Sequence, residues 1–131
     1  MAIHSPIEYD AASDAVRAVY DDIMKTRGTD RVNDFWKALA HHPPTLERVW
    51  RELKTVMAPG ALDPLTKEML YLAVSAANGC TYCIHSHTAS ARARGMTDAM
   101  HGELMAIVGM ASQTNALVET LQVEVDDAFR R

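Results

Sequence analysis

The chain has 131 residues, of which 48% are hydrophobic and 23% are charged, and its net charge is −4 at pH 7. These values match ordinary globular domains and exclude a fibrous or intrinsically disordered protein, and the lack of a basic run argues against nucleic acid as a partner. No charged leader with an apolar segment begins the chain, and no apolar run approaches the ~20 residues of a membrane span, so we expect a cytoplasmic protein without a membrane partner.

Helical periodicity runs through almost the whole chain, and no stretch alternates apolar and polar residues as a strand does. We therefore expect an all-α fold that forms a single domain over residues 1–131, with about six to seven helices. The expected helices cover about residues 12–25, 33–40, 45–57, 65–77 and 80–94, with another that begins at Thr97 and a last one around residues 117–125.

The helix expected over residues 65–77 has a clear start, since Asp63 can cap free N–H groups and Pro64 suits the first helical position. It is apolar on nearly all sides, apart from a narrow polar stripe that includes Glu68 and Tyr71, so we expect protein around it. A buried carboxylate needs a partner, so Glu68 should have one. The alternative is that Glu68 is a solvated acid in the first turn, where the helix dipole favours a negative charge.

Both cysteines of the chain, Cys80 and Cys83, lie three residues apart at the start of the next expected helix. Cα atoms at this spacing are about 5 to 6 Å apart, which allows a disulfide. So short a loop stabilises a fold little, and the cytoplasm keeps such a pair reduced. The pair therefore indicates thiol redox chemistry more than a structural link.

Within that helix, His87 shares a face with both cysteines, whereas His85 points elsewhere. The helix N-terminus favours a thiolate on Cys80, and His87 lies one turn after Cys83 as a base or a cationic partner. Each cysteine therefore has an activating neighbour, and the dipole alone favours Cys80 as the first nucleophile.

These residues form one pattern with fixed spacing. Eleven residues separate Glu68 from Cys80-x-x-Cys83, and three more separate Cys83 from His87. The pattern resembles the signature of the AhpD-like alkylhydroperoxidases, within the carboxymuconolactone decarboxylase family. The resemblance is close over about residues 65–95 and less specific in the flanking helices. It implies an AhpD-like helical bundle with the CxxC pair at the start of a central helix.

The resemblance further implies a peroxidase with an antioxidant role, in which Cys83 attacks a hydroperoxide and Cys80 then closes a redox disulfide. Glu68 and His87 would carry protons. Hydroperoxidases of the family carry a relay histidine where this chain has Tyr82, which could donate a hydrogen bond instead. Tyr82 and His85 are thus auxiliary candidates at most.

The same resemblance implies a small organic hydroperoxide or hydrogen peroxide as substrate, and a protein thiol or lipoyl group as electron donor. No cofactor and no metal are needed for this chemistry. The many apolar helix faces favour a homo-oligomer, as a dimer, trimer or hexamer.

Two other interpretations use the same residues. Cys80 and Cys83 with His85 or His87 supply ligands that suit zinc, although a continuous helix discourages a closed tetrahedral site. Alternatively, the dithiol is a redox sensor that switches assembly without catalytic turnover. Lactone decarboxylation is less attractive because it gives the CxxC pair no task.

Overall fold

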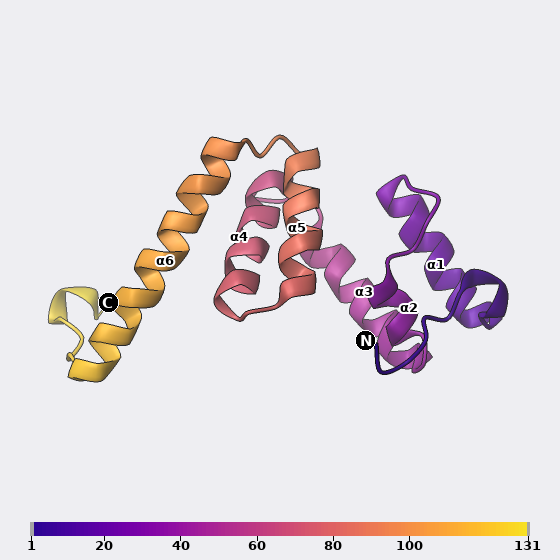
Figure 1. The fold of residues 1–131 in the computed structure, drawn as a ribbon, viewed down its shortest axis with the longest axis horizontal. Coiled ribbons are helices and arrows are strands. Elements are labelled where there is room, and N and C mark those ends of the chain that lie inside the picture. Colours follow the sequence, from indigo (N-terminus) through magenta and orange to yellow (C-terminus); the bar gives the residue numbers. More distant parts are fainter. Residues whose placement is uncertain (1, 131) are drawn as a thin grey trace. The chain divides into compact units, whose positions relative to one another are not determined.

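The computed structural model describes residues 2–130, and within them the fold consists of helices without strands (Figure 1). The expected all-α class is confirmed. The six α-helices are α1 (Asp14–Arg27), α2 (Asp34–Leu39), α3 (Pro43–Met57), α4 (Pro64–Ala77), α5 (Thr81–Ala93) and α6 (Asp98–Leu121), and short 3-10 turns cover Tyr9–Ala11 and Asp127–Phe129.

The helices form two compact units that meet in sequence between Ala58 and Pro59. The first unit contains α1 to α3, and the second contains α4 to α6. The single domain expected over residues 1–131 stays a prediction. All four predicted catalytic side chains belong to the second unit.

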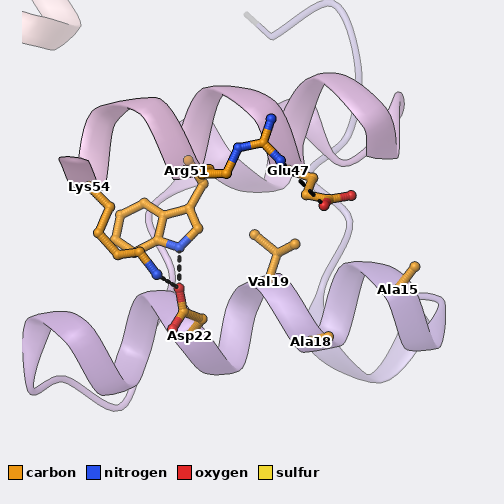
Figure 2. A pocket seen from close by; sticks show the side chains of 8 residues that line it. Ala15, Ala18, Val19, Asp22, Glu47, Arg51 and Lys54 are labelled. Carbon is orange, nitrogen blue, oxygen red and sulfur yellow. Dashed lines mark hydrogen bonds and ion pairs between the residues drawn. The ribbon is translucent and has the colours of Figure 1, made fainter. Parts of the chain in front are cut away.

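The first unit is built around two tryptophans, Trp36 and Trp50, whose rings meet edge to face with centroids 5.3 Å apart. Asp22 on α1 accepts hydrogen bonds from Lys54 Nζ at 2.5 Å and from Trp50 Nε1 at 2.7 Å, and these two bonds hold the pKa of Asp22 below its ordinary value (Figure 2). Figure 2 also shows a groove between α1 and α3 beside this contact, and the groove is lined by none of the predicted site residues.

In the second unit, α4 and α5 pack as an antiparallel pair, and α6 contacts α4. The start of α4 is as predicted: Pro64 is its first residue, and the Asp63 side chain accepts a hydrogen bond from Thr66 N at 3.0 Å. Gly79, with φ +69°, takes the left-handed conformation in the tight turn between α4 and α5. Leu72, Ala91, Met96 and Leu104 form the buried core of the unit.

Two helix boundaries differ from the sequence prediction. α3 begins at Pro43 rather than Thr45, because prolines fit the first turn of a helix and His42 Nδ1 caps it by accepting from Thr45 N. The separate helix expected around residues 117–125 is instead the last part of α6, which runs unbroken from Asp98 to Leu121. No proline interrupts the sequence there.

Much of the apolar surface of α4 and α6 is open, which differs from the prediction for α4. Leu70 and Val74 on α4 are 52% and 60% exposed, although α4 was expected to be surrounded by protein. On α6, Ile107 is 67% exposed. The exposed apolar residues of α6 are Met105, Ile107, Met110, Leu117, Val118 and Leu121. None of the described helices combines the length and hydrophobicity that a membrane span requires.

Candidate functional site

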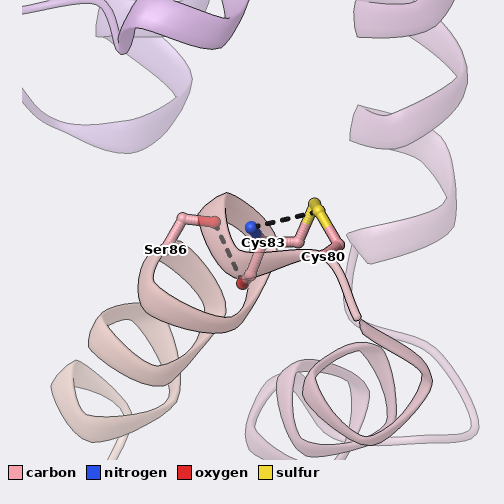
Figure 3. The surroundings of a disulfide bond; sticks show 3 residues. All are labelled: Cys80, Cys83 and Ser86. Carbon is pink, nitrogen blue, oxygen red and sulfur yellow. Dashed lines mark hydrogen bonds between the residues drawn. A yellow bond between two sulfur atoms is a disulfide. The ribbon is translucent and has the colours of Figure 1, made fainter. Parts of the chain in front are cut away.

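The two cysteines are joined as a disulfide at the start of α5 (Figure 3). Cys80 immediately precedes the helix and Cys83 lies in its first turn, so that their Cα atoms are 5.3 Å apart. Cys80 Sγ also accepts a hydrogen bond from Cys83 N at 3.3 Å, so the sulfur occupies the place of a helix-capping oxygen. Both residues are partly exposed, and the pair is therefore accessible for thiol chemistry.

A second pair joins α4 to α5. Glu68 Oε2 lies 2.7 Å from His87 Nδ1, and the Glu68 side chain is only 8% exposed. On its other oxygen, Oε1, the carboxylate lies 3.7 Å from an Arg94 guanidinium nitrogen. The expectation that Glu68 has a partner is confirmed. The alternative, that Glu68 is a solvated acid, is wrong because the side chain is buried.

The contact with Glu68 determines which nitrogen of His87 carries a hydrogen. A carboxylate only accepts hydrogen bonds, so the nitrogen that faces it, Nδ1, is the donor. When the ring is neutral, Nε2 is then unprotonated and has a lone pair to offer. This arrangement gives His87 a free basic nitrogen on the side opposite Glu68.

Tyr71 and Arg94 complete this group, and the sequence analysis gave neither of them a role. The Tyr71 ring on α4 stacks on the His87 ring, with centroids 3.7 Å apart and planes 22° from parallel. Two signals were present in the sequence: Tyr71 follows Glu68 by three residues on the polar stripe, and Arg94 follows His87 by seven residues.

The other candidates lie outside this group. His85 is exposed, and Tyr82 is 47% exposed. The hydrogen bonds described for residues 2–130 include none between His87 and either sulfur. The predicted residues therefore form two pairs, Cys80 with Cys83 at the start of α5 and Glu68 with His87 between α4 and α5. Within the same residues no three His, Cys, Asp or Glu side chains are grouped to hold a metal ion.

Comparison with known proteins gives the family. The model of the carboxymuconolactone decarboxylase family matches residues 43–124, a range that contains the helices α3 to α6. The chain belongs to this family.

Two similar curated members of the family are each called alkyl hydroperoxide reductase AhpD. The protein from Solibacter usitatus is 37% identical over 71 residues, and that from Maricaulis maris is 38% identical over 69 residues. These matches cover 54% and 53% of this chain but only 38% of each relative, so the chain corresponds to less than half of their length.

A solved structure of a family member matches over the full length. It is the alkylhydroperoxidase AhpD core from Rhodospirillum rubrum, which is 54% identical, with a TM-score of 0.95. The match covers 100% of this chain and 98% of that one. The expected AhpD-like helical fold is therefore confirmed.

The stack of Tyr71 on His87 leads to a prediction about stability. Tyr71→Ala should lower the free energy of unfolding of the disulfide form by about 1 kcal/mol, because His87 loses its aromatic stacking partner. Tyr71→Phe keeps the ring and should remain within about 0.5 kcal/mol of the native protein. Urea denaturation followed by circular dichroism measures both. Equal losses in the two variants would show that the hydroxyl, and not the stacked ring, stabilises the site.

Proposed function

We propose that this chain is a thiol-dependent hydroperoxide reductase that uses Cys80 and Cys83 as its redox pair. The observation that carries the proposal is the position of the disulfide on α5, the helix that also holds His87 against the buried Glu68. The names of the two curated relatives and of the solved structure support the same activity.

The first step is an attack of the Cys83 thiolate on one peroxide oxygen. The S–O bond forms as the O–O bond breaks, and the sulfur becomes a sulfenic acid while the alkoxide takes a proton and leaves as an alcohol. Removal of the thiol proton is the task of His87 Nε2, and Glu68 balances the charge on the ring. The role of Cys83 as nucleophile follows from the family resemblance.

In the second step, the Cys80 thiolate attacks the Cys83 sulfur and displaces hydroxide, which leaves as water after taking a proton. The two electrons that reduce the peroxide thus come from the dithiol, and the product is the disulfide of the structure. The position of Cys80 before α5 favours its thiolate, because free backbone N–H groups face it there.

A donor dithiol must then restore both thiols by disulfide exchange. We infer that this donor is a protein thiol or a lipoyl group, and that the reaction takes place in the cytoplasm without a cofactor or a metal. A small organic hydroperoxide or hydrogen peroxide is the substrate in this proposal.

Turnover of a hydroperoxide by the reduced protein tests the proposed function. With excess dihydrolipoamide, the native protein should consume many equivalents of cumene hydroperoxide, and Cys83→Ser should consume none above background. Glu68→Gln should lower the rate by about a hundredfold, within the range of a lost proton-transfer group. Glu103→Gln, an exposed acid on α6, is the matched control and should keep the native rate.

Two results would contradict the proposal. Full activity in Cys83→Ser would exclude the cysteine mechanism. Consumption that stops after one equivalent, with the donor present and the thiols oxidised, would indicate a redox sensor instead.

We further propose that α6 and the open face of α4 are covered by other copies of this chain. Residues of both helices expose apolar side chains, as Val74 and Leu121 do at 60% and 71%. In Figure 1 the last part of α6 runs away from the α4–α5 pair, so this pair does not cover it. An exposed apolar surface of this kind favours association.

Light scattering at micromolar concentration should therefore give a mass of at least twice the 14.5 kDa of one chain. Leu117→Asp should shift the protein toward monomer, because it places a charge on the apolar side of α6. Ser112→Asp, which adds the same charge at an exposed polar position on the other side of α6, is the control. A monomeric native protein would overturn this part of the proposal.

A further inference from the structure

Arg94 lies at the C-terminal end of α5, with one guanidinium nitrogen 3.7 Å from Glu68 Oε1 and 3.3 Å from the Ser90 carbonyl oxygen. Its side chain is 45% exposed, whereas the carboxylate that it approaches is 8% exposed. His87 occupies the other oxygen of the same carboxylate. One buried negative charge is thus shared by two groups, of which only Arg94 has a permanent positive charge.

The side chains in contact with His87 or with its partner Glu68 come from α4 and α5. α4 supplies Glu68 and Tyr71, and α5 supplies Arg94. α6 carries Asp98, His101 and Glu103 in its first turns, and of these Asp98 is paired with Arg92 at 2.9 Å. Arg94 is therefore the cation that balances Glu68 when His87 is neutral.

We propose that Arg94 is a positioning residue that keeps His87 neutral, with its hydrogen on Nδ1 and with Nε2 free to accept a proton. The use of that nitrogen as a base for the thiol rests on the proposed function. The protonation state itself does not, because it depends only on the contacts of Glu68 with His87 and Arg94.

The physical reason is that the buried carboxylate requires one compensating positive charge. With Arg94 present, a second positive charge on His87 would be repelled. Without Arg94, one of two changes restores the balance: His87 becomes imidazolium, or Glu68 takes a proton and donates it to Nδ1. Both changes place a hydrogen on Nε2, and the nitrogen is then no longer a base.

Nitrogen-15 NMR of histidine-labelled protein tests this directly, because the chemical shifts of the ring nitrogens report which of them carries hydrogen. The resonances of His87 are assigned as those lost in His87→Gln. At about pH 7, close to the range in which free histidine titrates, native His87 should show hydrogen on Nδ1 alone. Arg94→Gln should show hydrogen on Nε2 in a large fraction of molecules.

Two variants serve as controls. Arg94→Lys keeps the positive charge and should restore the native shifts at least in part. Arg92→Gln removes a neighbouring arginine that pairs with Asp98 instead of Glu68, and it should leave the His87 shifts unchanged. Native shifts in Arg94→Gln would overturn the proposal.

The pH dependence of the first thiol oxidation gives a second readout. In Arg94→Gln the rate with one equivalent of cumene hydroperoxide should be about threefold lower near pH 6, a modest loss because Arg94 is half-exposed. It should come closer to the native rate at higher pH, because the ring then loses the hydrogen that blocks Nε2. An equal loss at every pH would indicate a merely structural role and contradict the proposal.

The two readouts separate this inference from the proposed function. If the native protein does not react with hydroperoxides, the proposed function fails, but the NMR experiment still tests Arg94. If the native protein turns over hydroperoxide but the nitrogen chemical shifts of His87 are the same in Arg94→Gln, the inference about Arg94 fails and the proposed function stands.

Discussion

The buried carboxylate of Glu68 constrains the geometry of the second unit. A charge with 8% exposure is costly unless it is paired, and both of its partners, His87 and Arg94, come from α5. The contact therefore sets how α5 lies along α4. Because Cys80 precedes His87 by seven residues, the same register orients the disulfide end of the helix.

Two different stabilising effects act at the two parts of α5. At its N-terminus, free backbone N–H groups favour a thiolate on Cys80, and the Cys83 amide already binds that sulfur in the disulfide form. Two turns further, a carboxylate and an aromatic ring orient His87. In our proposal the first effect favours closing and reopening of the disulfide, and the second supplies proton transfer.

Local signals in the sequence predicted the parts of this site that depend on neighbouring residues. The Asp63–Pro64 start of α4, the cysteines at the start of α5 and the need of Glu68 for a partner all follow from short-range rules. Tyr71 and Arg94 were missed because their roles depend on how α4 packs against α5, which periodicity does not give. The sequence did not tell which apolar residues of α6 lie in the core and which stay exposed, because a hydrophobic pattern does not distinguish burial within one chain from burial between copies.

In our proposal the two cysteines reduce a hydroperoxide and end as the disulfide seen here. Intact mass and free-thiol count of the reduced, chelator-treated protein, followed after addition of one equivalent of an organic hydroperoxide, test it most directly. We expect fast loss of both thiols with a mass decrease of about 2 Da, and a trapped sulfenic acid on Cys83 in the Cys80→Ser variant. Thiols that stay reduced for hours would contradict it.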